Sequence, residues 1–308
     1  MNSIEPVFRI LSENFPGDVD ILQLRELTTW HTGGPAVCIT VTTIGMLADL
    51  LGLTAREGIP WFILGLGSNV LASDAGCSEV IIRLSGGLAR TEWHRSGNRW
   101  DLRIGAGVHL PSLSGAACSR GASGLEFAIG IPGTVGGAVF MNAGAYGNSL
   151  ADFLKSVTVL DYRGSANIIP VEECCFAYRS SRFQKERTVI TGVTMSLGLG
   201  DSSVLRSEGK RILELRRKKF PLQHPNAGSV FRKPADRISP GKLIEDAGLK
   251  GRTVGGAEVS RRHANFIINT GKATSDEIAE LIDIVRESVL SSSGVLLKEE
   301  IRYLGRRN

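Results

Sequence analysis

The sequence has few aromatic residues, no long apolar run and no recognisable targeting segment. Aromatic residues make up 6% of the 308 residues and are not interleaved with a basic stripe, which disfavours a nucleic-acid-binding groove. No apolar run reaches the ~18 residues that a membrane span needs, so we expect no membrane span. The first residues lack the basic and apolar segments of a secretory signal, and we therefore expect a cytoplasmic protein.

The cysteines and histidines are too few and too scattered to indicate a disulfide framework or a metal site. The five cysteines are odd in number and include no Cys-x-x-Cys pair. The five histidines include no i, i+4 pair of the kind that binds zinc from one helix face. We expect reduced, buried thiols and no metal.

Length and charge set broad limits on the fold and the ligand. A chain of 308 residues exceeds the ~250–300 residues at which a single core stops growing, which predicts two or three subdomains. The net charge of +5 suits an anionic small substrate as well as nucleic acid and does not choose between them. A polar break at residues 198–203 predicts a domain boundary.

Hydrophobic periodicity indicates an α+β or α/β fold, because β-branched strands alternate with glycine turns and short helices. The clearest helix follows Thr274, which forms a capping box with Glu277. Helices are expected at 4–14, 44–57, 111–126, 204–219 and 275–290. Strands are expected at 36–43, 61–64, 80–84, 100–104, 157–161, 189–193 and 295–304.

Glycine is abundant, with 37 residues of 308, against the ~7% that is usual. One glycine-rich stretch, residues 65–71, directly follows an apolar strand. Its glycines let backbone N–H groups approach a diphosphate, and Ser68 and Asn69 can donate further hydrogen bonds. Val70 replaces the third glycine of the dinucleotide-binding fingerprint, so taken alone the stretch is more typical of a tight turn.

A second glycine-rich stretch covers residues 130–147 and contains almost no charge. Pro132 fixes one φ angle, while the glycines around it permit positive φ. The pattern predicts a rigid surface without side chains, which suits the flat ring and diphosphate of a dinucleotide. The alternative is a structural loop, although the length and low charge disfavour a merely solvated one.

Two short stretches present polar side chains that could carry chemistry. Arg179 lies in Tyr-Arg-Ser-Ser and could pair bidentately with a carboxylate, although alone the stretch is more typical of a surface turn. Ser229 follows a glycine within residues 225–231 and could be presented at a tight bend. Its surroundings do not match Gly-x-Ser-x-Gly, so a hydrolase nucleophile is not supported, and a turn serine is the alternative.

Two further candidates lie near the C-terminus. Adjacent acids on a strand point to opposite faces, so either Glu299 or Glu300 should face protein or a cavity, unless the strand is a solvated edge. Alternation leaves Glu300 on the more polar face, with Lys298 and Arg302. His263 is isolated from the other histidines and is more typical of a hydrogen-bonded structural residue than of a ligand.

In their order and spacing, these stretches resemble the flavin-dependent UDP-N-acetylenolpyruvoylglucosamine reductases of peptidoglycan synthesis. The resemblance runs from residue 28 to residue 302 and is most specific over residues 130–147. The other matching stretches are 64–69, 178–181, 227–231, 263–267 and the Glu-Ile-Arg ending at 300–302. A flavin oxidase of the same superfamily and an inactive nucleotide-sugar-binding protein are the alternatives, and these motifs disfavour both.

The resemblance implies an α+β fold with a bipartite FAD-binding unit of the PCMH/vanillyl-alcohol-oxidase type and a separate α+β substrate domain. Residues 1–57, joined by the C-terminal strand 298–308, would form the first FAD-binding subdomain. Residues 58–200 would form the second subdomain, and residues 201–297 the substrate domain. The lack of a long insertion between Phe183 and Val189 matches the shorter form of the family, and the resemblance favours a monomer.

The resemblance also implies a reaction. NADPH reduces non-covalently bound FAD, NADP+ leaves, and the nucleotide-sugar substrate UDP-N-acetylglucosamine enolpyruvate takes its place. Hydride passes from FAD N5 to the terminal carbon of the enolpyruvyl group, which gives UDP-N-acetylmuramate. Arg179 and Glu300 would stabilise the enediolate, and Ser229 would protonate it.

The matching motifs place the expected ligand contacts. FAD is expected at Gly65, Leu66, Gly67, Ser68, Asn69, Val70, Gly130, Ile131, Pro132, Gly133, Val135, Gly136, Gly137, Ala143, Gly144, Tyr146 and Gly147. The substrate is expected at Tyr178, Lys218, Lys219, Asn226, His263 and Asn265. The two lysines end a basic helix and could approach the UDP diphosphate, the alternative being a solvated face. Phe220, Asn226 and Lys298 depart from the residues common in the family.

Overall fold

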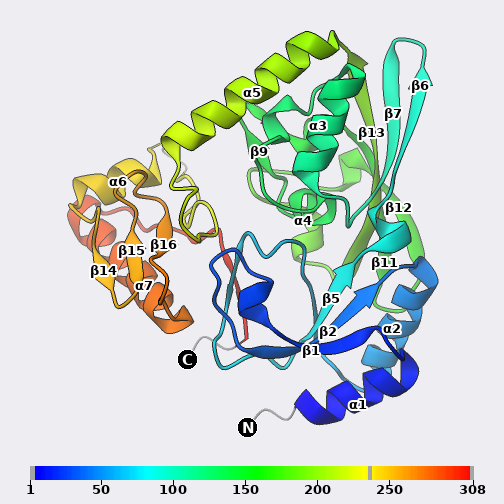
Figure 1. Ribbon diagram of the computed structural model, residues 1–308, viewed down its shortest axis with the longest axis horizontal. Helices are drawn as coiled ribbons and strands as arrows, with labels where there is room; N and C mark the ends of the chain where they lie inside the picture. The colour runs from blue at the N-terminus through cyan, green and yellow to red at the C-terminus, as the bar shows by residue number, and fades with distance from the viewer. Residues whose placement is uncertain (1–3, 235–237, 306–308) are drawn as a thin grey trace.

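The structure is a computed structural model that describes residues 4–234 and 238–305, and it confirms the expected α+β class (Figure 1). The five expected helices are present, but the one expected at 111–126 ends at Arg120, because Gly121 adopts φ 69° and caps it. The α-helices are α1 (Ile4–Asn14), α2 (Ile44–Arg56), α3 (Leu110–Arg120), α4 (Val135–Phe140), α5 (Ser202–Lys219), α6 (Pro240–Asp246) and α7 (Ser275–Ser293). The 3-10 helices are η1 (Leu24–Glu26), η2 (Gly86–Ala89), η3 (Glu126–Ala128), η4 (Leu150–Asp152), η5 (Val171–Glu173) and η6 (Arg182–Gln184).

A mixed four-stranded sheet in the order β1-β2-β5-β3 forms the N-terminal part of the molecule. Its strands are β1 (Val19–Gln23), β2 (Pro35–Val41), β3 (Trp61–Ile63) and β5 (Val80–Leu84). The β-branched strands β2 and β5 pair in parallel, and α1 and α2 bury their leucines against the sheet. The turn that leaves β3 therefore starts at the carboxyl end of a parallel strand, where ligands of such sheets usually bind.

A larger antiparallel sheet runs in the order β12-β11-β13-β7-β6, with β8 paired to the end of β13. Its β6–β7 hairpin extends beyond the body of the molecule (Figure 1). Helices α3 and α4 pack on the sheet and, with it, enclose the largest hydrophobic cluster. The strands are β6 (Thr91–Ser96), β7 (Arg99–Gly105), β8 (Ala122–Ser123), β11 (Leu154–Asp161), β12 (Ala166–Pro170) and β13 (Thr188–Leu199). A small hairpin of β9 (Gly144–Ala145) and β10 (Asn148–Ser149) lies between α4 and β11.

The C-terminal part packs α6 and α7 against a three-stranded sheet of β14 (Thr253–Val254), β15 (Ala257–Val259) and β16 (Ile267–Asn269). The long helix α5 connects this part to the large sheet and packs against α3 and η3 (Figure 1). The three-part division expected from the sequence stays a prediction. Within the described residues, no helix is long and apolar enough to cross a membrane.

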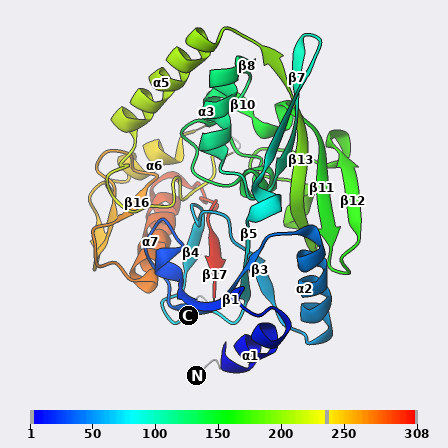
Figure 2. The same ribbon diagram turned by 45° about the vertical axis from the view of Figure 1, so that its right-hand side comes forward.

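The end of the chain returns to the N-terminal part (Figure 2). There β17 (Arg302–Leu304) pairs in parallel with β4 (Val70–Ala72), which directly follows the first glycine-rich stretch. The strand expected over 295–304 is wrong for residues 295–301. Backbone groups of that segment bond instead to residues 230–232, in a short contact with a single bridge between Phe231 and Glu299.

Trp30 and Asn269 join the N-terminal part to the C-terminal sheet. Trp30 is fully buried, and its indole Nε1 donates to the carbonyl of Ile267 at 2.8 Å. The buried Asn269 amide donates to the Trp30 carbonyl at 2.9 Å and accepts from the N–H groups of Gly271 and Ala273. One side chain thus satisfies three backbone groups at this junction.

Asn269→Ala should lower the free energy of unfolding by about 3 kcal/mol, because it leaves buried backbone groups without partners. Denaturant unfolding followed by fluorescence measures the change. Asn98→Ala, at the exposed tip of the β6–β7 hairpin, is the matched control and should stay within about 0.5 kcal/mol of the wild type. Equal effects of the two substitutions would contradict the role given to the Asn269 amide.

Candidate active site

A cavity of about 1070 Å³ opens where the two sheets, α5 and the C-terminal part meet. Its wall includes the first glycine-rich loop and much of the second, which lie far apart in the sequence. The residues expected at FAD that line it are Gly65, Leu66, Gly67, Ser68, Asn69, Val70, Ile131, Pro132, Gly133, Gly136, Gly137, Ala143 and Gly144. The other four, Gly130, Val135, Tyr146 and Gly147, lie outside this wall.

The two glycine-rich loops are fixed to each other and to their surroundings. Ser68 donates its hydroxyl to the carbonyl of Pro132 at 2.8 Å, which ties the loops together. Gly67 has φ 61°, and a Cβ there would lie 2.2 Å from the carbonyl oxygen of Leu27, so only glycine fits. The Ser68 hydroxyl is therefore used within the protein, although its residue lines the cavity.

The cavity wall fits FAD in space and in charge. A Cβ on Gly133 would meet no atom closer than 3.8 Å, so that glycine leaves open space for a ligand. Arg216 and Arg302 line the cavity, and burial lowers the pKa of each guanidinium. Neither has a carboxylate partner among residues 4–234 and 238–305. Two arginines that line the cavity without acidic partners suit the diphosphates of a dinucleotide and a nucleotide sugar.

Arg216 was not predicted from the sequence to contact a ligand. Lys218 and Lys219, at the end of the same basic helix, were predicted instead. Arg216 shares the inner face of α5 with the buried Gly209 and Ile212, a spacing that would have identified it. It contacts the Tyr146 hydroxyl. A Cβ on Gly130 would lie 2.3 Å from its Cδ, so this glycine makes room for the arginine.

The backbone brings Ser229 and Glu300 to the same wall of the cavity. The N–H of Glu300 donates to the carbonyl of Val230 at 2.7 Å, and the N–H of Arg232 donates to the carbonyl of Lys298 at 2.8 Å. Gly228 adopts φ 76°, which makes the sharp bend that presents Ser229. Ser229 and Glu300 both line the cavity.

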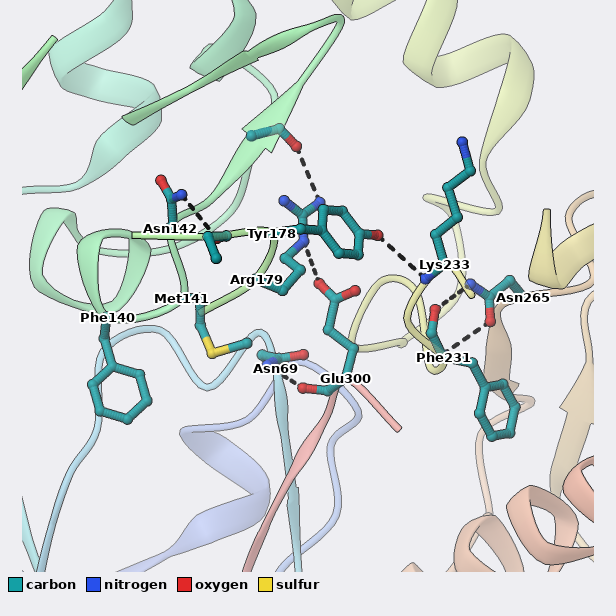
Figure 3. A network of polar contacts seen from close by, with 12 residues as sticks. Asn69, Phe140, Met141, Asn142, Tyr178, Arg179, Phe231, Lys233, Asn265 and Glu300 are labelled. Atoms are coloured by element: carbon teal, nitrogen blue, oxygen red, sulfur yellow. Dashed lines mark hydrogen bonds and ion pairs between the residues drawn. The ribbon is translucent and has the colours of Figure 1, made fainter. Parts of the chain in front are cut away.

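Arg179 reaches this wall from the segment between β12 and β13 of the large sheet. It lies at the tip of a tight hairpin that is closed by two hydrogen bonds between Ala177 and Ser180. Nε donates to Oε1 of Glu300 at 2.7 Å, and Nη2 donates to the carbonyl of Gly144 at 3.0 Å (Figure 3). Arg179 also lines the cavity, so the three expected catalytic residues lie along one wall.

Burial controls the protonation of Glu300. Its side chain is 13% exposed, and burial, the largest influence, raises the pKa of the carboxyl, while Arg179 and Arg232 act in the opposite direction. The pair can therefore hold a ligand carboxylate beside a guanidinium, with a carboxyl group next to it that resists ionisation more than a solvated one. Such a site favours additional negative charge more than a site with a fully ionised acid.

Several residues expected at the substrate have side chains that are committed elsewhere. The Asn226 amide accepts from the N–H of Gly228 and donates to the carbonyl of His224, which builds the turn before Ser229. The Asn265 amide is buried and bonds both the N–H and the carbonyl of Phe231. These contacts shape the segment that carries Ser229 rather than reach into the cavity.

The remaining expected substrate residues lie near the cavity without lining it. Tyr178 is exposed, and its hydroxyl accepts from the N–H of Lys233 at 3.3 Å. The His263 ring packs against both Phe220 and Phe266, and burial lowers its pKa, which favours the neutral ring. None of the six expected substrate residues is in the cavity wall: Tyr178, Lys218, Lys219, Asn226, His263 and Asn265.

Some side chains that line the cavity were not predicted from the sequence to contact a ligand. Phe220 stacks on Phe266 with ring centres 5.0 Å apart, and both face the cavity. Arg302 stands in the Glu-Ile-Arg ending, and its guanidinium lies over the Phe140 ring at 4.9 Å. Among the described residues, no group of three or more His, Cys, Asp or Glu side chains could hold a metal ion.

Comparisons with known proteins agree with this geometry. Residues 35–167 match the model of an FAD binding domain, and residues 220–304 match the C-terminal domain of UDP-N-acetylenolpyruvoylglucosamine reductase. The reductase of Heliobacterium modesticaldum is 45% identical over 90% of this chain and 88% of its own length. That of Anoxybacillus flavithermus is 38% identical over 92% of this chain and 93% of its own.

A solved structure gives the same result. The reductase of Thermus caldophilus superposes with a TM-score of 0.80 at 34% identity, covering 93% of this chain and 98% of that one. An FAD-binding domain, a matching C-terminal domain and full-length relatives thus agree. The chain belongs to the UDP-N-acetylenolpyruvoylglucosamine reductases, the flavin-dependent oxidoreductases of peptidoglycan precursor synthesis.

Proposed function

We propose that the protein uses NADPH and bound FAD to reduce UDP-N-acetylglucosamine enolpyruvate to UDP-N-acetylmuramate. The observation that carries the proposal is the placement of Arg179, Glu300 and Ser229 along one wall of a cavity that also contains both glycine-rich loops. When bound, FAD would supply a hydride from N5 to the terminal carbon of the enolpyruvyl group. The residues discussed below bind and orient the substrate and manage its charge and proton.

Arg179 and Glu300 are proposed to receive the substrate carboxylate. Addition of hydride to the terminal carbon builds negative charge on the neighbouring carbon, and this charge spreads into the carboxylate as an enediolate. The Arg179 guanidinium is held in advance by Glu300 and Gly144, so it need not reorganise when the charge develops. The raised pKa of Glu300 supports a role in sharing a proton with that carboxylate.

Ser229 is proposed to deliver the proton to the carbon next to the carboxylate. A serine hydroxyl is a weak acid, so the transfer needs a strongly basic carbon held at close range. The backbone contact between Val230 and Glu300 holds the serine beside the residue that binds the carboxylate. This proximity supports the assignment.

The loops at residues 65–70 and 131–137 are proposed to hold FAD, with Ala143 and Gly144 close to the reacting groups. Arg216, Phe220 and Phe266 are proposed to contact the nucleotide ligand that alternates in the remaining space, first NADPH and then the nucleotide sugar. The guanidinium supports diphosphate binding, and the stacked rings support contact with a planar base.

The proposal includes the three-part division of the chain. Residues 1–57 with 298–308 and residues 58–200 would form the FAD-binding unit, and residues 201–297 the substrate domain. The pairing of β17 with β4, which lies within residues 58–200, supports the joining of the C-terminal strand to the FAD-binding unit as a whole. A cytoplasmic monomer is also proposed, and five free cysteines suit a reducing compartment.

Ser229→Ala should slow the return of oxidised flavin by ~10²–10⁴-fold, since it removes the proton donor. The enzyme is reduced anaerobically with NADPH and mixed with UDP-N-acetylglucosamine enolpyruvate while flavin absorbance is recorded. Reduction by NADPH should be unchanged, and Ser96→Ala on the exposed strand β6 should behave as the wild type. An unchanged rate in Ser229→Ala would remove the serine from the mechanism. Reoxidation by oxygen alone in the wild type would favour the oxidase alternative.

Glu300→Gln should slow the same step but leave the protein at least as stable as the wild type at pH 8. Burial raises the Glu300 pKa, so ionisation is less favourable in the folded protein than in the unfolded chain. As the pH falls through the folded pKa, the folded wild type takes up the proton first and gains stability, and the glutamine variant does not. Thermal unfolding of both proteins from pH 8 to pH 4 should show the variant's advantage shrinking. A less stable variant at pH 8 would show that the Arg179 ion pair outweighs burial.

A further inference from the structure

Arg179 has a backbone conformation that L-residues rarely adopt. Its φ is 52°, in the left-handed region, at the tip of the hairpin formed by residues 177–180. A non-glycine residue keeps such a conformation only where neighbouring groups enforce it. This conformation sets the direction of the Cα–Cβ bond, from which the side chain extends until its guanidinium meets Glu300.

Two side-chain amides hold the hairpin against the end of α4. Asn142 lies two residues after that helix, and its Nδ2 donates to the carbonyl of Ala177 at the base of the hairpin, at 3.0 Å (Figure 3). Gln184 donates from Nε2 to the carbonyl of Arg179 itself at 3.1 Å. The same Nε2 donates to the carbonyl of Phe140 at 2.8 Å, so Gln184 ties the tip of the hairpin to the last turn of α4.

Neither amide donor is left for a ligand. Asn142 is buried and is absent from the cavity wall, and its Oδ1 accepts from the N–H of Ala151. Asn142 also has a left-handed backbone, with φ 42°, which Asn tolerates better than other L-residues. Gln184 does line the cavity, but its Nε2 is occupied by the two carbonyls. Their contacts therefore act on the Arg179 hairpin.

We propose that Asn142 and Gln184, here named the amide clamp, are positioning residues for the reduction step. They hold Arg179 in its left-handed conformation so that its guanidinium meets the substrate carboxylate beside Glu300. The inference rests on the proposed function, because the carboxylate is that of the enolpyruvyl substrate. It goes beyond that function in assigning residues that act only through Arg179.

Asn142→Asp and Gln184→Glu test the clamp with almost no change in shape. Each replaces an amide donor by a carboxylate oxygen facing a carbonyl, so the hydrogen bond to the hairpin is lost. The acceptor that bonds Ala151 is retained in Asn142→Asp. Asn98→Asp makes the same substitution at an exposed turn and is the matched control.

The two half-reactions separate positioning from general damage. Reduction of the flavin by NADPH does not involve a substrate carboxylate and should stay within about twofold of the wild type in both variants. Return of the oxidised flavin on addition of the enolpyruvyl substrate should slow about 10–100-fold, since a displacement near 1 Å can cost ~10²-fold. Thermal unfolding and the spectrum of bound flavin identify a variant that is misfolded. If Asn142→Asp is misfolded, Gln184→Glu provides the test.

A double-substitution cycle with Arg179→Lys decides whether the clamp acts through the arginine. If it does, Asn142→Asp should cause little further loss in the Arg179→Lys background. Equal slowing of both half-reactions, or the full loss reproduced on Arg179→Lys, would overturn the inference while leaving the proposed function intact. If wild-type flavin is not reoxidised by the enolpyruvyl substrate, the proposed function fails and the clamp's role with it.

Discussion

Residue 300 connects three segments of the chain that are distant in sequence, and the geometry of the site depends on these contacts. Its N–H donates to the carbonyl of Val230, its carbonyl accepts from the Asn69 amide, and its carboxylate accepts from Arg179. The first contact positions the bend that carries Ser229. The second positions the first glycine-rich loop, and the third the hairpin that carries Arg179 (Figure 3). The proposed catalytic groups are therefore aligned through one short stretch of backbone, and not by the packing of any single subdomain.

The same arrangement explains why the C-terminal strand is so short. A continuous strand over residues 295–304 would use all of its backbone groups in one sheet. Here residues 298–300 bond to the segment after Ser229, and from residue 302 the chain pairs with β4 instead. Changing partner within four residues interrupts the ladder, and the interruption puts Glu300 between two parts of the molecule.

Much of this could be predicted from the sequence, and the limits have physical causes. Most strand and helix positions followed from hydrophobic periodicity. The glycine-rich loops were predicted because glycine allows backbone conformations and close approaches that other residues do not, and Gly67 indeed has no room for a side chain. Arg179, Ser229 and Glu300 were predicted from a family resemblance, because nothing local in the sequence reports that residues 121 apart share an ion pair. The position of Arg216 in the cavity wall could have been predicted from the spacing of Gly209 and Ile212 along α5. The exposed lysines at the end of that helix were predicted instead, because they suited the positive net charge.

The residues expected at the substrate are absent from the cavity wall for a different reason. Asn side chains can satisfy backbone groups as well as bind ligands, and a sequence does not distinguish the two. Asn226 and Asn265 satisfy backbone groups on the segment around Ser229. Their contribution to the reaction, like that of the amide clamp, is expected through the position of another residue.

Placing the proposed catalytic groups costs the fold stability in two measurable ways. Among the described residues, five non-glycine residues have positive φ, and three of them belong to the site or contact it: Arg179 lines the cavity, Asn142 bonds the Arg179 hairpin, and Tyr146 contacts Arg216. Each such conformation costs of order 1–3 kcal/mol. Burial further disfavours the charged forms of Arg216, Arg302 and Glu300. Both costs are concentrated around the cavity. An anionic ligand bound there would pair with the arginines and so reduce the cost of burying their charges. Ligand binding should therefore stabilise this region more than the rest of the molecule, because an anionic ligand pairs with the two arginine charges that burial disfavours.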